Sequence, residues 1–258
     1  MINKTDVWVD IFPVYNTKTL QTKNTLFLLF FLRGLVVKNC YLCPSLHLIT
    51  DTMNAYLYVF DTLADWETGY ITAELNTGKF FRQSVNPVRV ITIANTKDAV
   101  KTMGGITILP DRTIAETVFT DNDLLILPGG ETWMEDVHLP ILSVVAEYLP
   151  KGMIVGAICG ATMALAKAGI LDTRKHTSND LNFLQQTCPD YKGAALYINE
   201  PAVTDNNLIT APGTAPLEFA QHILQRLGVF KPETLEAWYG LNKFKDASYF
   251  FSLLASLQ

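Results

Sequence analysis

One cysteine lies between an apolar segment and a run of small residues. The sequence around it is Val155-Gly156-Ala157-Ile158-Cys159-Gly160-Ala161-Thr162. We expect a buried strand to end at Ile158 and a helix to begin at Gly160, which puts the thiol on a sharp turn at a helix N-terminus. The partial positive charge there favours the thiolate. Cys159 is therefore predicted to be a nucleophile; the alternative is a small buried hydrophobic residue.

A glycine-rich segment, Pro128-Gly129-Gly130, follows the apolar run 123–127. The carboxyl ends of parallel strands meet at one edge of a sheet, where α/β proteins bind their ligands. Glycine also leaves the backbone N–H groups unobstructed. We therefore expect the N–H groups of Gly130 and Gly160 to form an oxyanion hole. The alternative is an ordinary turn between strand and helix.

An acidic residue, Glu67, follows the first expected strand, in Asp65-Trp66-Glu67. Its position at the same sheet edge allows a hydrogen bond to the Cys159 sulfur or a role as general acid and base. The alternative is an acid at a helix start that interacts with the helix dipole.

Histidine is the usual partner of a nucleophilic cysteine. Three histidines fall within the expected main domain: His138, His176 and His222. We expect His138 and His222 at the surface, because one precedes a helix and the other lies in the middle of one. His176 follows the helix after Cys159, where the chain could return to the site, so it is the predicted catalytic partner.

Composition narrows the class of protein. Hydrophobic residues make up 49% of the 258 residues and charged residues 17%, with a net charge of -5. A large core can therefore form, while the absence of a dense basic stripe argues against a nucleic-acid partner. Four cysteines are too few for a disulfide framework. We expect a cytoplasmic protein that acts on a small molecule, with no cofactor and no metal site.

From residue 55 onward, strand and helix signals alternate in the pattern of a parallel sheet covered on both faces. Strands are expected at 55–60, 88–94, 106–109, 123–127 and 153–158, and a hairpin at 202–210 with Asn206-Asn207 in its turn. Helices are expected at 65–75, 140–149, 160–168, 180–186 and 216–227.

The two ends of the chain differ from this pattern. Residues 1–52 are predicted to be an N-terminal extension that is poorly ordered or not native, with Met53 as the natural start. The apolar run 26–32 is too short to span a membrane, although a signal peptide is an alternative. Cys40 and Cys43 form a C-x-x-C pair without a second pair to complete a zinc site. Residues 231–258 are predicted to be a helical tail.

Five motifs in order resemble the ThiJ/PfpI family of the class I glutamine amidotransferase-like superfamily, over about residues 53–230. They are Asp65-Trp66-Glu67, Leu127-Pro128-Gly129-Gly130, Ala157-Ile158-Cys159-Gly160-Ala161, Arg174-Lys175-His176-Thr177-Ser178 and Gly213-Thr214-Ala215-Pro216-Leu217-Glu218-Phe219-Ala220. The resemblance implies a flavodoxin-like α/β/α sandwich and, in many members, a homodimer. It implies that Cys159 is the nucleophile, that a protonated Glu67 hydrogen-bonds it, and that Gly130 and Gly160 supply the oxyanion hole.

The histidine departs from the family pattern. One branch of the family carries a histidine directly after the cysteine, where this chain has Gly160. In another branch the histidine lies further downstream, at a position that aligns with Thr177, one residue from His176. The sequence resembles a small bacterial subgroup with an A-I-C-G-A motif and a nearby H-T-x-N, here His176-Thr177-Ser178-Asn179. A complete Cys-His pair is therefore not implied.

Two functions follow from these residues. The first is a cysteine-dependent hydrolase or lyase that acts on a small amide, aldehyde or ketoaldehyde. The second is a non-enzymatic, redox-sensing or chaperone-like protein in which Cys159 is oxidised. An amidotransferase subunit is less consistent with the sequence, because a late H-x-E pair is missing.

Overall fold

The computed structural model describes residues 53–257. The predictions for residues 1–52, including the apolar run 26–32 and the Cys40/Cys43 pair, lie outside this range. Within it, no helix is long and apolar enough to cross a membrane.

A seven-stranded sheet forms the centre of the fold, with the order β5-β2-β1-β6-β7-β9-β8. Its strands are β1 (Ala55–Tyr58), β2 (Val90–Ala94), β5 (Arg112–Thr113), β6 (Leu124–Leu127), β7 (Ile154–Ile158), β8 (Val203–Asp205) and β9 (Leu208–Ala211). All pairings are parallel except β8 with β9. The β1, β6 and β7 strands are buried along their whole length, as strands covered on both faces must be.

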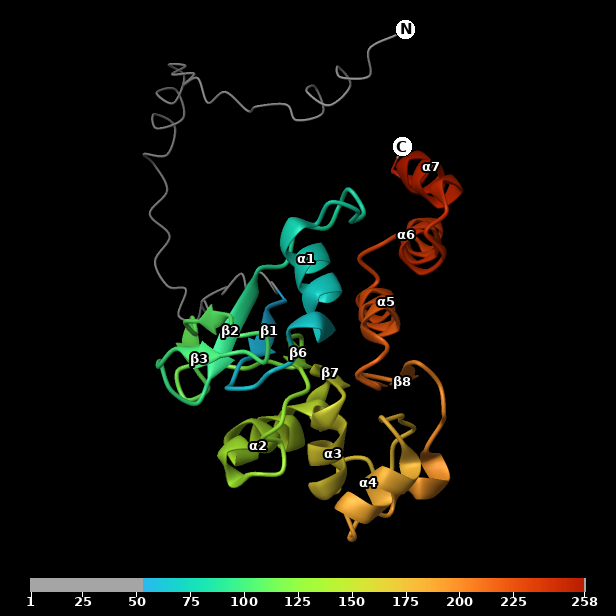
Figure 1. Cartoon of the computed structure of the whole chain (residues 1–258). Coiled ribbons are helices and arrows are strands. Elements are labelled where there is room, and N and C mark those ends of the chain that lie inside the picture. Colours follow the sequence, from blue (N-terminus) through green and yellow to red (C-terminus); the bar gives the residue numbers. More distant parts are fainter. Residues whose placement is uncertain (1–52, 258) are drawn as a thin grey trace, which may run out of the picture. The chain divides into compact units, whose positions relative to one another are not determined.

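Helices cover both faces of the sheet (Figure 1). On one side lie α1 (Gly69–Thr77) and α5 (Pro216–Leu227); on the other lie α2 (Leu139–Tyr148), α3 (Gly160–Lys167) and α4 (Leu181–Thr187). Short 3-10 turns η1 (Asp65–Glu67), η2 (Asp136–His138), η3 (Leu149–Lys151) and η4 (Gly193–Leu196) complete the connections. The predicted α/β/α sandwich with a mostly parallel sheet is confirmed.

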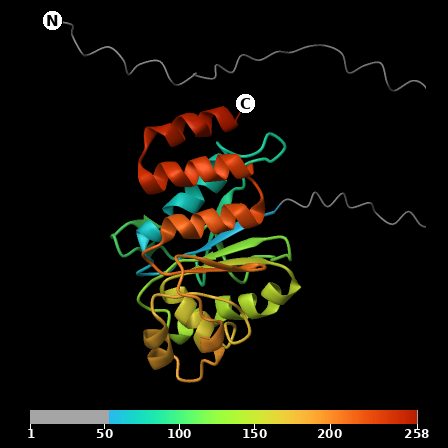
Figure 2. The same cartoon turned by 90° about the vertical axis from the view of Figure 1, so that its right-hand side faces the viewer.

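The C-terminal residues form two further helices, α6 (Pro232–Phe244) and α7 (Ala247–Ser256). Helix α6 packs on α5, and α7 packs on α6. Figure 2 shows these three helices as successive layers on one face of the sheet. Trp238 on α6 is buried against Tyr70 of α1 and Phe230. Leu253 on α7 is also buried, whereas Phe250 and Phe251 remain exposed. These two helices lie within the predicted helical tail at 231–258, and the domain boundary at residue 230 stays a prediction.

Several local expectations need correction. The helix expected at 65–75 begins only at Gly69, and Glu67 belongs to the 3-10 turn η1. The strand expected at 106–109 is β4 (Thr107–Ile108), which pairs with β3 (Val100–Lys101) in a separate two-stranded antiparallel sheet. The hairpin is confirmed: β8 and β9 are antiparallel, and Asn206 in the turn has a φ of 55°.

Gly156 lets α5 approach β7 closely. A Cβ added at this position would lie 2.8 Å from Ile223 Cδ1 and 2.9 Å from Phe219 Cζ, both on α5. The helix therefore packs directly on the strand that ends at Cys159.

We predict that Gly156→Val lowers the free energy of unfolding by about 2 kcal/mol, because the added carbons overpack the contact between α5 and β7. Urea unfolding measures the change. Gly69→Ala is the control, because a Cβ there would meet no atom within 4 Å, and it should change stability by less than about 0.5 kcal/mol. Equal effects of the two substitutions would contradict this account of the packing.

Candidate active site

Cys159 occupies the turn between β7 and α3. Its backbone has φ 59° and ψ -124°, a conformation that residues with a Cβ rarely adopt. The Cys159 N–H donates to the Ala211 carbonyl at 2.9 Å, and the Thr162 hydroxyl donates to the Cys159 carbonyl at 2.6 Å. The side chain is only partly buried. These bonds hold the strained turn in place and leave the thiol at the N-terminus of α3.

Glycines allow three chain segments to meet at the thiol. A Cβ added at Gly129 would lie 2.7 Å from both Cys159 Cβ and Glu67 Oε2. One added at Gly213 would lie 2.8 Å from the Cys159 sulfur and 2.9 Å from Glu67 Oε1. A larger residue at either position would push the thiol and the carboxyl out of place.

Glu67 is fully buried beside Cys159. Its Oε2 accepts a hydrogen bond from the Gly129 N–H. Its Oε1 has no nitrogen or oxygen partner within residues 53–257. This oxygen lies on the side of the sulfur, because a Cβ added at Gly213 would touch both atoms. The structure thus brings Glu67 to Cys159, as the sequence predicted, although from a 3-10 turn and not from an α-helix.

Burial perturbs both groups of this pair. It raises the pKa of the Glu67 carboxyl above its ordinary value, and hydrogen bonds from Gly129 and Cys159 offset part of the rise. It also raises the pKa of the Cys159 thiol; the Asn179 amide works in the opposite direction, and the negative charge of Glu67 adds to the rise. Two acids in one buried site disfavour double ionisation. A carboxylate with a raised pKa is a better acceptor for the thiol proton.

Asn179 is a site residue that the sequence reasoning did not select. Its Nδ2 donates to the Cys159 sulfur at 3.4 Å, and its Oδ1 accepts from the Gly213 N–H at 2.8 Å. The bond from Gly213 fixes the orientation of the amide, because only the oxygen can accept it. The sequence motif His176-Thr177-Ser178-Asn179 contains this residue, but the sequence analysis assigned a role only to its histidine.

His176 is held away from the thiol by other bonds. The ring is fully buried; Nδ1 is hydrogen-bonded to the Arg174 carbonyl at 2.7 Å, and Nε2 to the Tyr191 hydroxyl. Burial lowers the pKa of His176. Both ring nitrogens therefore have partners, and no hydrogen bond among residues 53–257 joins His176 to Cys159.

The surface location predicted for His138 is wrong. His138 is fully buried, and its ring nitrogens are hydrogen-bonded to the Tyr58 hydroxyl at 2.9 Å and the Thr132 hydroxyl at 3.0 Å. Burial lowers its pKa to about 4, so the ring is neutral at pH 7. His222 on α5 is partly buried and is hydrogen-bonded to the Thr204 hydroxyl.

The two predicted oxyanion-hole glycines lie next to each other. A Cβ added at Gly160 would lie 2.9 Å from the Gly130 carbonyl oxygen and 3.5 Å from the Gly130 nitrogen. Gly160 is the first residue of α3, so its N–H has no partner within the helix. A hydrogen bond from this N–H to Cys159 also lowers the thiol's pKa.

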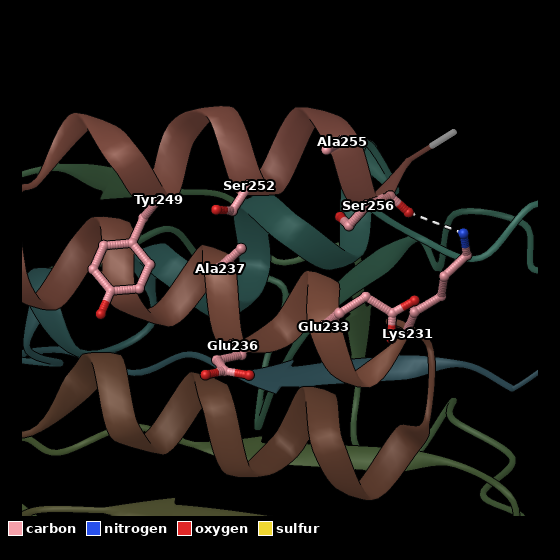
Figure 3. Close-up of a pocket in the computed structure, with 8 residues that line it drawn as sticks. All are labelled: Lys231, Glu233, Glu236, Ala237, Tyr249, Ser252, Ala255 and Ser256. Carbon is pink, nitrogen blue, oxygen red and sulfur yellow. Dashed lines mark hydrogen bonds between the residues drawn. The ribbon is translucent and has the colours of Figure 1, made fainter.

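One cavity lies beside Asn179, whose amide donates to the Cys159 sulfur; Cys159 itself does not line it. The cavity has a volume of about 410 Å³, and the residues that line it include Ser178, Asn179, Pro212, Thr214 and Lys243. A second cavity, of about 580 Å³, lies between α6 and α7, where Lys231 donates to the Ser256 carbonyl (Figure 3). The second cavity contains no cysteine or histidine. The first cavity is lined by a residue that contacts the thiol, whereas the second is not.

Within the described range, no group of three His, Cys, Asp or Glu side chains is arranged to hold a metal ion. The groups that meet at the turn are the thiol, the buried carboxyl and backbone N–H groups.

The fold and the site together define the class of the protein: a parallel α/β sandwich that carries a cysteine on a strained turn beside a buried glutamate. The model of the DJ-1/PfpI family matches residues 53–226. The chain belongs to the DJ-1/PfpI family, which confirms the resemblance seen in the sequence.

Three relatives illustrate the range of this family. The chain is 50% identical over 207 residues to a Bacillus subtilis protein named uncharacterized protease YoaZ, covering 80% of this chain and 99% of the relative. It is 27% identical over 146 residues to the glutathione-independent glyoxalase DJR-1.2 of Caenorhabditis elegans, covering 54% and 74%. The crystal structure of a thiJ/pfpI family protein from Bacillus anthracis superposes with a TM-score of 0.78, at 51% identity, covering 79% of this chain and 96% of that one.

We predict that Cys159→Gly is more stable to unfolding than Cys159→Ala by about 1 kcal/mol, because glycine adopts the positive φ without strain. Both variants lack the sulfur, so their difference isolates the backbone. Urea unfolding of the two proteins measures it. If the alanine variant is equally or more stable, the turn is not strained.

Proposed function

We propose that this protein is a cysteine-dependent hydrolase or lyase that acts on a small amide, aldehyde or ketoaldehyde. The observation that carries the proposal is the contact of three groups in one place: the Cys159 thiol, the buried Glu67 carboxyl and the adjoining glycine N–H groups. The relatives named protease and glyoxalase support the two substrate classes. Homodimer assembly, a cytoplasmic location and a small-molecule substrate belong to the same proposal.

In the proposed mechanism, the Glu67 carboxylate accepts the thiol proton as the sulfur attacks the carbonyl carbon of the substrate. The negative charge that develops on the carbonyl oxygen is stabilised by the N–H groups of Gly130 and Gly160. Protonated Glu67 then returns the proton to the leaving amine of an amide. With a ketoaldehyde, protonated Glu67 instead gives its proton to the alkoxide. The carboxylate then moves the proton of the former aldehyde carbon to the neighbouring carbonyl carbon, which leaves a thioester. Water releases the product from the sulfur in both cases.

Asn179 has the role of a positioning residue in this mechanism. Its amide N–H donates to the sulfur and so favours the thiolate. An amide cannot accept a proton at neutral pH, so Asn179 does not replace a histidine base. His176 remains part of the proposal only as a residue that supports the loop on which Asn179 lies, because both of its ring nitrogens are engaged.

We predict that Cys159→Ala lowers kcat/KM for methylglyoxal or a chromogenic amide by about a thousandfold or more, because the nucleophile is lost. Cys188→Ala is the matched control: Cys188 is a buried free cysteine whose thiol donates to the Met163 carbonyl, away from the site. It should retain activity. The measurement is the steady-state rate with both substrate classes. Turnover by Cys159→Ala equal to that of the wild type would contradict the proposal.

A second candidate function is redox sensing through oxidation of Cys159. The engagement of both His176 nitrogens favours it, since no histidine within residues 53–257 is hydrogen-bonded to Cys159. The N–H groups of Asn179 and Gly160 and the carboxyl of Glu67 surround the sulfur and could bind sulfinate oxygens.

For this second function, we expect mild peroxide to add two oxygen atoms to Cys159 before Cys188, because Cys188 is more deeply buried. Intact mass and peptide mapping locate the added oxygen. If Cys159 stays reduced while other cysteines oxidise, the sensor function fails.

A further inference from the structure

A third cavity lies at the point where the strand order of the sheet reverses. From β1 the chain moves outward to β2 and β5 on one side, and then returns to β6 on the other side of β1. Open α/β sheets bind ligands outside the carboxyl ends of the strands at such a point. Here a cavity of about 290 Å³ is lined by residues from the ends of β1 and β2 and from the segment after β6. We call it the switch-point cavity.

The switch-point cavity is separate from the Cys159 site. Neither Cys159, Glu67 nor Asn179 lines it. Phe60, which does line it, also fills the space beside Gly130, where an added Cβ would lie 2.4 Å from Phe60 Cε2. The Phe60 ring packs edge to face on Trp133, with 5.3 Å between the ring centroids. These rings form part of the wall between the two sites.

The floor of the cavity is aromatic and held in place by hydrogen bonds. Tyr58, Phe60 and His138 are buried, and their ring centroids lie 4.8 to 5.7 Å apart. The bonds from His138 to the hydroxyls of Tyr58 and Thr132 fix the ring. Tyr58 and His138 have no exposed area and support the floor from beneath, so the apolar groups that a ligand can touch are Phe60, Val100 and Val137. Such a preformed apolar surface suits a flat aromatic ligand. The volume exceeds the ~150 Å³ of a cavity that binds benzene, which leaves room for a short substituent.

The polar groups of the cavity favour a ligand that donates hydrogen bonds and carries positive charge. Asp61 and Glu135 are exposed carboxylates on the lining, and no lysine or arginine lines it. Asn95 also belongs to the lining; its Nδ2 donates to the Val137 carbonyl, while its Oδ1 has no partner within residues 53–257. The two carboxylates would attract an ammonium group and repel an anion.

We propose that the switch-point cavity binds a small aromatic amine in its ammonium form, with the ring against Phe60, Val100 and Val137 and the ammonium group toward Asp61 and Glu135. This site is independent of the proposed reaction at Cys159. Its ligand makes no covalent bond and need not be a substrate.

The test measures binding of 2-phenylethylamine to the full chain by NMR titration, with 3-phenylpropionate and 2-phenylethanol as the anionic and neutral analogues. We expect saturable millimolar or tighter binding of the amine, with the carboxylate weaker by about tenfold because charges of equal sign repel. Cys159→Ala should leave the affinity for the amine unchanged, which separates this site from the proposed function.

Two substitutions locate the ligand. Val137 lines the cavity and is 49% exposed, whereas Val118 is 80% exposed and lies outside it. Val137→Trp should abolish binding and Val118→Trp should not. As a second variant, Asp61→Asn with Glu135→Gln should remove the preference for the amine over the alcohol; asparagine can still accept the hydrogen bond that Asp61 Oδ1 receives from the Lys101 N–H. The absence of saturable binding, equal affinity for the carboxylate, or a preference for the amine that survives the double substitution would each overturn the proposal.

Discussion

The close approach of a thiol and a carboxyl in a buried turn is the constraint on which the rest of the site depends. Glu67 and Cys159 come from segments 92 residues apart in the chain and meet only because Gly129 and Gly213 carry no side chain. Each of those glycines lies where a Cβ would enter the space of both groups. The carboxyl gains a hydrogen bond from Gly129 but loses most of its hydration. That loss makes it a stronger base than an exposed glutamate.

The sheet places these groups because its neighbouring strands are parallel. Strands β1, β6, β7 and β9 are consecutive in the sheet, and the segments that follow them carry Glu67, Gly129, Cys159 and Gly213. Parallel neighbours end at the same edge, so four distant segments converge without a long loop. The contact of α5 with Gly156 fixes the strand that leads into Cys159. The same strand, β7, therefore contributes to the packed core and positions the cysteine.

Much of this arrangement could be predicted from the sequence. Continuous apolar runs identified β6 and β7, and the change from strand to helix at Cys159 located the strained turn. The two-residue strand β5 was missed, because two residues carry too little hydrophobic pattern to recognise. Glu67 was placed correctly at the sheet edge, but the 3-10 turn that carries it depends on tertiary contacts such as that with Gly129.

The histidines show what a local pattern cannot predict. His176 lies in the expected segment, yet its ring is bonded to Tyr191, fifteen residues further along the chain. His138 precedes a helix, as many exposed residues do, but Tyr58 and Thr132 supply partners that make burial possible. Asn179 is held at the sulfur by a hydrogen bond from the Gly213 N–H. Sequence spacing cannot predict this bond, because the two residues are far apart in the chain.

The central claim is that Glu67 and Cys159 form one coupled acid pair. The most direct test is a pH titration of the Cys159 thiolate by its ultraviolet absorbance, with the Cys159→Ala protein subtracted as a blank, in the wild type and in Glu67→Gln. The account predicts a higher thiolate pKa in the wild type, because the negative carboxylate opposes a second charge in the same buried site. A thiolate pKa in Glu67→Gln that equals or exceeds the wild-type value would contradict it.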